Sequence, residues 1–251
     1  MRRILITAAL LALACAPEAQ ARTLGSLDFK ACSLASPFSG DAIAAQCATL
    51  QVPENPAAPA GRKIGLKIAW IAADRDDAAE PDPVFMLAGG PGQSALESYP
   101  QAAKAFAETR KKRHILLVDQ RGTGGSNALT CKEPFDESAL PTAQAAADYT
   151  RRCLASLSKR ADPRFYTTSE AIQDLDAVRK AIGAQQINLV GISYGTRVAQ
   201  QYAAKYPQST RTIVLDSVAP NSLVLGNEFA RNLEDALDLQ FALCAKAPAC
   251  V

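Results

Sequence analysis

Histidine is almost absent from this sequence: His114 is the only one among 251 residues. No C-x-x-C pair occurs either, so the ligand spacing of a structural zinc site is missing. An excess of one charge is also lacking, because 27 basic residues face 25 acidic ones and the net charge is +2. We therefore expect no metal, no cofactor, and neither nucleic acid nor an acidic membrane as a partner. The one basic run, residues 110–113, is interpreted as the solvated C-terminal turn of a helix.

Long apolar runs are missing beyond the first 21 residues. The N-terminus itself has a basic start at Arg2 and Arg3, an apolar stretch from Ile4 to Ala16, and an A-x-A cleavage pattern at 19–21. This stretch is too short for a permanent membrane helix. Residues 1–21 are therefore predicted to be a signal peptide, and the mature protein is expected to be exported to the periplasm or the extracellular space, without contact to the membrane. A lipoprotein would need cleavage before Cys15, where residues 12–14 place the large side chain wrongly.

Six cysteines remain after removal of the signal peptide, an even number that suits disulfides in an oxidising compartment. Many pairings are possible in principle. We expect neighbours in the sequence to pair, because this closes short loops: Cys32 with Cys47, Cys131 with Cys153, and Cys244 with Cys250.

Short apolar runs alternate with helical patterns along the chain, which predicts an α/β fold with a mostly parallel sheet flanked by helices. The expected strands are 48–52, 63–71, 84–87, 114–118, 187–190 and 212–215. The expected helices are 95–113, 171–182, 196–206 and 227–246. Residues 127–166 are interpreted as a polar excursion.

The strongest motif is Gly191-Ile192-Ser193-Tyr194-Gly195, which matches G-x-S-x-G between an expected strand and an expected helix. Such a turn is strained and lifts the serine hydroxyl above the sheet. The following helix directs its N-terminal dipole, and the Tyr194 backbone N–H, at a developing oxyanion. Ser193 is therefore the candidate nucleophile. A plain strand-to-helix turn is the alternative.

A second motif, Gly89-Gly90-Pro91-Gly92, follows an expected strand. A hydrolase whose nucleophile lies in a G-x-S-x-G turn needs a second N–H donor for the oxyanion, and a glycine-rich loop after a neighbouring strand supplies it. We assign the Gly90 N–H to this role, with Gly89 as the alternative. Residues 90–95 also fit the dinucleotide pattern G-x-G-x-x-G/A, with Asp119 at the end of the next strand as the ribose ligand. Export and the separate serine motif speak against that alternative.

The motifs in their order, GGPGQS, DQRGTGGS, GISYGT and VLDSVAP, resemble the secreted tripeptidyl-aminopeptidase and proline-iminopeptidase group of α/β-hydrolases. The resemblance extends from about Cys32 to Cys250 and includes the positions of the cysteines. It implies a serine hydrolase with a small peptide as substrate, Ser193 as nucleophile, and the turn at 89–92 as oxyanion loop. Many proline iminopeptidases carry a histidine just before these glycines; here it is Ala88, as in the tripeptidyl branch.

The fold orders its catalytic triad as serine, acid and histidine along the chain. No histidine follows Ser193, and His114 is expected to serve packing or a hydrogen bond at a strand edge. Asp216 is interpreted as a structural loop residue, because the family places its acid later. We therefore expect the triad acid and base to be absent from this chain. The chain is expected to be a truncated hydrolase that is inactive by itself.

The expected organisation is a signal peptide at 1–21, an incomplete hydrolase core at 22–219, and the start of a helical cap at 220–251. Glu228 and Glu234 of the cap could contact a substrate amine, but a solvated helix face is the favoured interpretation. An exported esterase of the same fold and a non-catalytic hydrolase-like fragment remain the alternatives. The sequence gives no indication of the oligomeric state.

Overall fold

The computed structural model describes residues 21–37, 39–131 and 142–250. All but the last residue of the predicted signal peptide lies outside these ranges. Within them, no helix combines the length and the apolar character that a membrane span requires.

One eight-stranded sheet forms the centre of the molecule, in the order β1-β2-β3-β4-β6-β5-β7-β8. Neighbours from β1 to β6 run antiparallel, whereas β6, β5, β7 and β8 run parallel to one another. The strands are β1 (Arg22–Leu24), β2 (Leu27–Ala35), β3 (Ala42–Pro53), β4 (Lys63–Ile71), β5 (Val84–Leu87), β6 (Ile115–Val118), β7 (Ile187–Ile192) and β8 (Thr210–Asp216).

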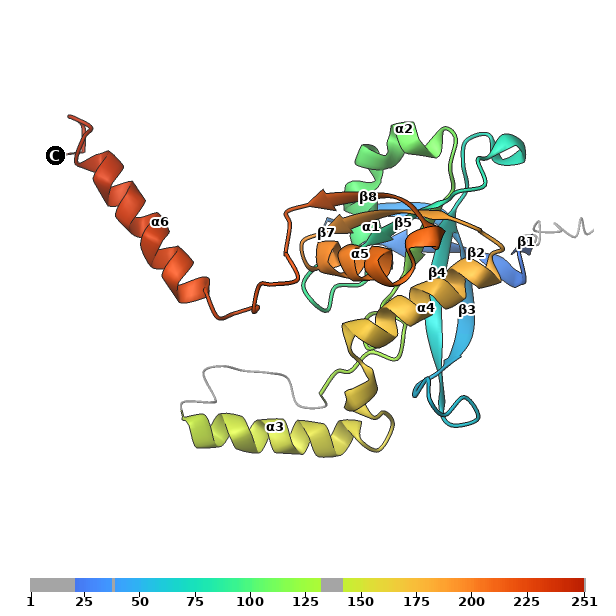
Figure 1. Ribbon diagram of the computed structural model, residues 1–251, viewed down its shortest axis with the longest axis horizontal. Helices are drawn as coiled ribbons and strands as arrows, with labels where there is room; N and C mark the ends of the chain where they lie inside the picture. The colour runs from blue at the N-terminus through green and yellow to red at the C-terminus, as the bar shows by residue number, and fades with distance from the viewer. Residues whose placement is uncertain (1–20, 38, 132–141, 251) are drawn as a thin grey trace, which may run out of the picture.

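Helices cover both faces of the sheet (Figure 1), as the sequence predicted. On one face, apolar side chains of α4 and α5 pack against the sheet, and on the other face those of α1 do so. The helices are α1 (Ala95–Ala102), α2 (Ala107–Arg110), α3 (Ala143–Leu157), α4 (Thr168–Ala181), α5 (Tyr194–Lys205) and α6 (Phe229–Cys244).

The positions of the two central strands, β5 and β6, account for their apolar sequences. Every residue of β5 and β6 is buried, because helices cover these strands on both faces, and both strands are therefore continuous apolar runs. Among the described residues β8 is the edge strand of the parallel half, and there Ile213 is 41% and Val214 is 54% exposed. The parallel half of the sheet thus has a buried middle and an open edge.

All three expected disulfides are present. Cys32 joins Cys47 across the neighbouring strands β2 and β3, Cys131 joins Cys153, and Cys244 joins Cys250.

Several element boundaries differ from the prediction. Strands β1 and β2 and helix α3 were not expected, and α3 lies within the segment interpreted as a polar excursion. The expected helix at 95–113 is broken, because a tight 3-10 turn at 103–106 separates α1 from α2. Helix α5 begins at Tyr194, two residues earlier than expected.

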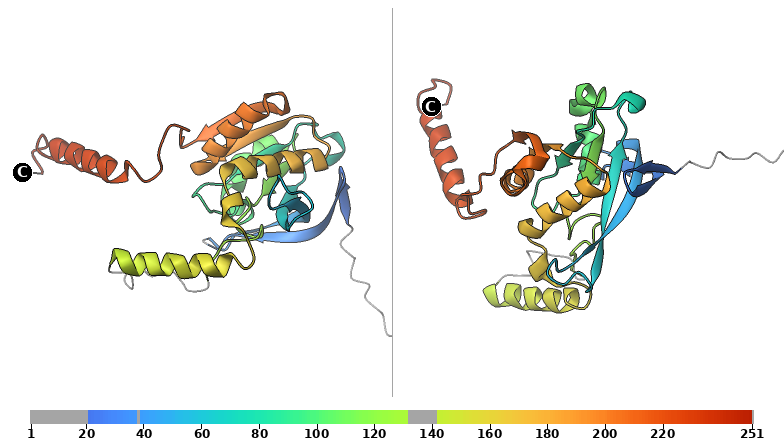
Figure 2. Two further views of the ribbon diagram at one scale, coloured as in Figure 1. Left: turned by 60° about the horizontal axis from the view of Figure 1, so that its bottom comes forward. Right: turned by 45° about the vertical axis from the view of Figure 1, so that its right-hand side comes forward.

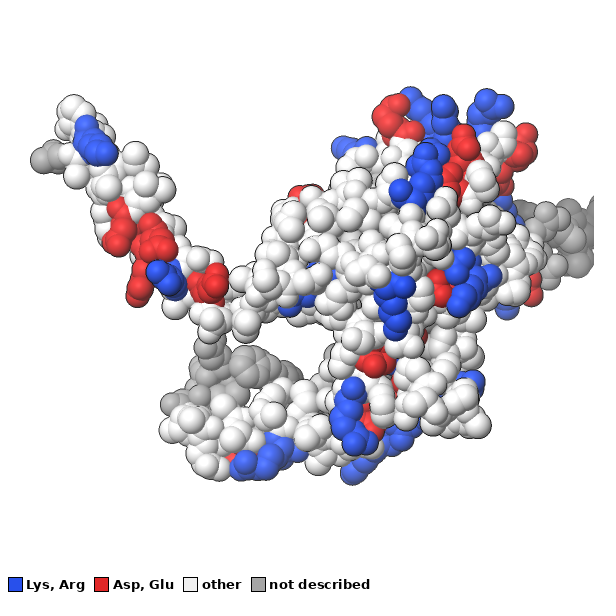
Figure 3. All heavy atoms as spheres, viewed as in Figure 1, with Lys and Arg blue, Asp and Glu red and all other residues white. Residues whose placement is uncertain are grey.

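Helix α6 extends away from the sheet in every view (Figures 1 and 2). Charged side chains gather on α6 and around α2, while the surface around β8 is mainly uncharged (Figure 3). Near α2, three residues of the basic run pair with carboxylates: Arg110 with Asp74, Lys111 with Glu108, and Arg113 with Asp82. Arg113 is half-buried in its pair, so the run is less solvated than the sequence indicated.

His114 lies at the start of β6 and serves as a structural acceptor. Its Nδ1 accepts a hydrogen bond from the Ala73 N–H at 3.1 Å, and its ring meets Trp70 edge-on at 5.1 Å between centroids. Burial lowers the pKa of the imidazole below its ordinary value of 6.5, although the Asp76 carboxylate opposes this shift; nearby Arg22 adds to it. The expectation of a packing and hydrogen-bonding role is met.

This lowered pKa makes stability depend on pH in a defined window. The unfolded chain binds the proton more tightly than the folded chain. The free energy of unfolding is therefore unaffected by His114 above about pH 6.5, and it falls as the pH drops from there towards the pKa of the folded state. The slope is at most about 1.4 kcal/mol per pH unit. Urea unfolding of the wild type and of His114→Asn, which retains an acceptor, measures this contribution. Because no other histidine is present, the two profiles should diverge in this window, and parallel profiles would contradict the assignment.

Candidate active site

Ser193 occupies a sharp turn between β7 and α5. Its backbone angles are φ 54° and ψ −121°, a region that side-chain-bearing residues rarely adopt. Its N–H donates a hydrogen bond of 2.8 Å to the Asp216 carbonyl at the end of β8. The Ser193 side chain is exposed at the carboxyl end of the parallel strands. Strain of this kind is typical of a serine held out for reaction.

The glycines of the motif are required by close backbone contacts. A Cβ at Gly195 would lie 2.1 Å from the Leu87 carbonyl oxygen of β5, and one at Gly191 would lie 2.4 Å from the Gly195 carbonyl oxygen. Any side chain at these two positions would force the turn apart. The strand-to-helix turn predicted from the sequence is therefore present with the spacing that it needs.

The glycine loop after β5 lies directly against Ser193. A Cβ at Gly89 would come within 2.9 Å of the Ser193 Cβ, so the two loops touch. Gly90 has a φ of +99°, which glycine adopts without strain. Tyr194 is the first residue of α5, and its N–H has no acceptor within the helix. Across the described ranges, neither the Gly90 N–H nor the Tyr194 N–H donates to another protein atom. Their joint use as oxyanion donors remains a prediction.

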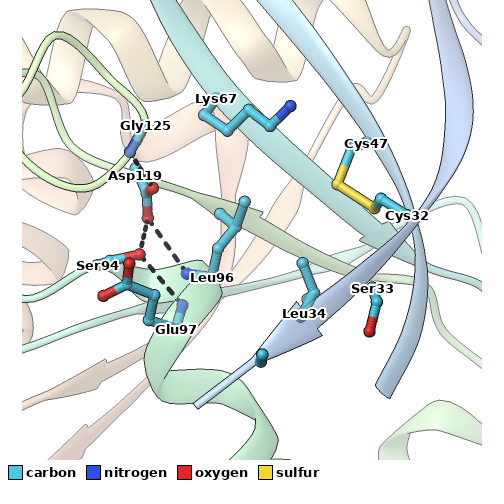
Figure 4. A pocket seen from close by; sticks show the side chains of 11 residues that line it. Cys32, Ser33, Leu34, Cys47, Lys67, Ser94, Leu96, Glu97, Asp119 and Gly125 are labelled. Carbon is cyan, nitrogen blue, oxygen red and sulfur yellow. Dashed lines mark hydrogen bonds between the residues drawn. A yellow bond between two sulfur atoms is a disulfide. The ribbon is translucent and has the colours of Figure 1, made fainter. Parts of the chain in front are cut away.

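The buried carboxylate of Asp119 connects the loop after β6 to the start of α1 (Figure 4). It accepts hydrogen bonds from Ser94 Oγ at 2.7 Å, from the Leu96 N–H at 3.2 Å and from the Gly125 N–H at 2.8 Å. Asp119 is only 2% exposed, so its oxygens are occupied and are not open to a ribose. This removes the main support for a dinucleotide site, and gives Asp119 a role in fixing the segment that follows the glycine loop.

The family model of the alpha/beta hydrolase fold matches residues 82–250. The chain belongs to the α/β-hydrolase family. It is 30% identical to the serine protease Hip1 of Mycobacterium tuberculosis over 82% of this chain, and 29% identical to a tripeptidyl aminopeptidase of Streptomyces lividans over 69% of it. The chain spans 42% and 35% of the lengths of these two relatives.

Among solved structures, a proline iminopeptidase from Mycobacterium smegmatis resembles the chain with 18% identity and a TM-score of 0.42. That likeness covers 66% of this chain and 42% of the other. The family model and the two sequence relatives confirm the α/β-hydrolase fold and the resemblance to the peptidase group, both of which the motifs predicted.

A second buried charged residue, Arg121, also anchors the loop that follows β6 in this α/β-hydrolase. The Arg121 guanidinium makes two hydrogen bonds of 2.7 Å to the Asp174 carboxylate on α4, and the two side chains are only 1% and 6% exposed. Arg121 also donates to the Glu54 and Phe165 carbonyls. The sequence did not predict the pairing of Arg121 with Asp174, since no local pattern links residues that are 53 positions apart.

Two hollows flank the glycine loop of the α/β-hydrolase site. One, of about 300 Å³, is lined by residues that include Gly89, Gln93 and Ile192. The other, of about 230 Å³, is lined by residues that include Gly92 and Tyr194. The first volume lies at the lower limit of the usual range for a binding site and the second lies below it, but both hollows are lined by residues of the loop that touches Ser193.

The remaining candidate residues do not gather at Ser193. His114 precedes the start of β6, whereas Ser193 follows the end of β7. Because these strands run parallel, the two residues lie at opposite ends of the strands in the α/β-hydrolase sheet. The Asp216 carboxylate accepts from the neighbouring Ser217 hydroxyl at 3.0 Å, which fits a structural loop residue. Glu228 and Glu234 are exposed on or beside α6. In the described part of the chain, the Ser193 hydroxyl has no hydrogen-bonded base.

Proposed function

We propose that this chain carries the nucleophile and the oxyanion loop of an exported serine aminopeptidase that acts on short peptides. The observation that carries the proposal is the strained turn of Ser193 in contact with Gly89. The names of the matched relatives, a serine protease and a tripeptidyl aminopeptidase, support a peptide as the substrate. The three disulfides are compatible with export.

The reaction follows from the groups at the site. The Ser193 oxygen attacks the scissile carbonyl carbon while its proton passes to a general base. The N–H groups of Tyr194 and Gly90 stabilise the negative charge on the carbonyl oxygen. The C–N bond then breaks, the amine leaves with the proton, and an ester on Ser193 remains, which water hydrolyses by the same steps. No cofactor takes part.

Residues 194–251 include no histidine and therefore supply no histidine base to Ser193. A serine hydroxyl without a base is a weak nucleophile. We propose that the 251-residue polypeptide alone does not turn over substrate efficiently. In this proposal residues 22–219 form the hydrolase core, and residues 220–251, including α6, begin a cap that selects peptides by their free amino terminus.

Matched substrates test the proposal on the full-length product of the gene. An Ala-Ala-Phe peptide joined to a fluorogenic amine is compared with its N-acetylated form and with a p-nitrophenyl ester. We expect the free peptide to be cleaved at least about tenfold faster than the acetylated one, since about 1.4 kcal/mol of recognition gives this ratio. Hydrolysis of the ester alone would favour an exported esterase.

A fluorophosphonate probe distinguishes a catalytic protein from an inert one. The probe forms a covalent bond with an activated serine only, so labelling of Ser193 is expected in the full-length product. A folded full-length sample that stays unlabelled would favour a non-catalytic binding protein and contradict the proposal.

A further inference from the structure

A cavity of about 400 Å³ is distinct from the two hollows beside the glycine loop, because it shares no lining residue with them. It opens between β2, β4 and the first turn of α1 (Figure 4). Its volume falls within the range of small-molecule sites, about 300–1,000 Å³. The proposed peptidase reaction does not use this cavity.

One side of the cavity is apolar. The buried side chains of Leu34 and Leu96 contribute to it, together with the disulfide between Cys32 and Cys47. Figure 4 shows Leu96 pointing from α1 towards Lys67, with the disulfide beside them. A hydrocarbon group placed here would be removed from water, at a gain of about 25 cal/mol per Å² of apolar surface.

The other side carries a cation without a counter-ion. Lys67 is half-buried, and across the described ranges its Nζ has neither a hydrogen bond nor an ion pair. Asp119 also lines the cavity, but its two oxygens are already occupied by Ser94, Leu96 and Gly125. Glu97 lines the cavity from α1, and in Figure 4 its carboxylate points away from Lys67.

The position of Lys67 is fixed by the loop that follows β6. Its N–H donates to Ser126 Oγ at 2.8 Å, and its carbonyl accepts from the Asp119 N–H at 3.1 Å. Its stem packs so closely on Gly125 that a Cβ there would lie 2.9 Å from the Lys67 Cβ and Cγ. The backbone and the first stem atoms of Lys67 are therefore held beside the cavity before any ligand arrives, which reduces the entropy lost on binding.

We propose that this cavity binds a small apolar carboxylate, whose carboxylate pairs with Lys67 and whose hydrocarbon group packs on Leu34, Leu96 and the disulfide. The C-terminal residue of a short peptide and a short-chain fatty acid share this chemistry. The proposal does not depend on the proposed peptidase activity, because it needs only the cavity and its lining.

Titration of the whole chain with matched probes tests the proposal. N-acetyl-leucine carries the carboxylate, N-acetyl-leucinamide is its neutral counterpart, and hexanoate represents the fatty acids; binding is followed by NMR shifts and calorimetry. We expect at least one acid to shift resonances of Leu34 and Leu96, and N-acetyl-leucine, if it binds, to do so about tenfold more tightly than the amide, the effect of one charge-assisted hydrogen bond. The acid that binds identifies the source. Absence of binding by both acids, or equal affinity for N-acetyl-leucine and its amide, would overturn the proposal without any variant.

Two lysine variants give the matched control. Lys67→Gln keeps the stem that packs on Gly125 but removes the charge, whereas Lys63→Gln removes an exposed charge from the same strand outside the cavity. We expect Lys67→Gln to lower the affinity for the acid to that for the amide and Lys63→Gln to leave it unchanged. Thermal unfolding verifies that both variants are folded. Equal affinity of the wild type and a folded Lys67→Gln variant would contradict the role of Lys67.

Discussion

Replacing Ser193 by alanine is expected to lower kcat of the full-length protein by about 10⁵–10⁶-fold, the loss typical of removing a serine nucleophile. The substitution removes the only atom that forms the covalent intermediate. The neighbouring N–H groups and the two hollows stay in place, so KM should change little. The rate of peptide hydrolysis under saturating substrate measures the effect, and mass spectrometry after fluorophosphonate treatment shows which residue carries the label.

Ser217→Ala is the matched control for this substitution. Ser217 is also exposed, follows a strand and has a positive φ of 59°, but its hydroxyl only donates to the adjacent Asp216. We expect this variant to retain its labelling and nearly all of its rate. Retention of more than about a tenth of the activity by Ser193→Ala would assign the nucleophile to another residue, since a triad serine is worth far more than one order of magnitude.

Asp174→Ala is expected to destabilise the fold by about 3–5 kcal/mol, because it leaves the Arg121 guanidinium charged and buried without its counter-ion. The intact pair itself adds little net stability, since two desolvated charges largely offset their own attraction. The cost therefore arises from breaking the pair. The midpoint and slope of urea unfolding, measured for wild type and variant, give the difference in free energy.

A surface pair of the same residue types provides the comparison. Asp148 pairs with Arg151 on α3, and these side chains are 46% and 63% exposed. Asp148→Ala should change the free energy of unfolding by less than about 1 kcal/mol, because water solvates the remaining arginine. Similar small losses for both variants would mean that Arg121 reaches water when Asp174 is removed.

The parts of the fold that the sequence predicted are those whose pattern is local. The buried runs of β5 and β6 could be recognised because every residue is apolar. Strand β2 was missed because its buried face changes along its length. Phe29 packs with the cluster on the α4 side of the sheet, whereas Leu34 packs on the α1 side. The odd number of positions between these two buried residues interrupts the alternation of apolar and polar residues by which a strand is recognised in a sequence.

Helix boundaries failed for different physical reasons. Pro100 lies inside α1 and removes a backbone donor, and the chain tightens into a 3-10 turn soon after it. Gly195 lowers the helix propensity at the start of α5, so the pattern indicated a later beginning. The structure starts this helix at Tyr194 because the Ser193 turn leads directly into it.

The candidate site divides in the same way. Ser193 and the glycine loop could be identified because each motif is contiguous, although their contact through Gly89 is a property of the fold. The anchors of the loop after β6 could not be identified, because the partners of Asp119 and Arg121 lie at the start of α1 and on α4, far from them in the sequence. Short sequence patterns thus identify the candidate reactive residues, but they do not identify the residues that hold the neighbouring loops in position.

The hydrogen bond from the Ser193 N–H to the Asp216 carbonyl ties the reactive turn to the end of β8, the neighbour of β7 in the sheet. A displacement of β8 would therefore shift the backbone of the serine. The position of the hydroxyl thus depends, through a single backbone carbonyl, on a strand that does not contact it.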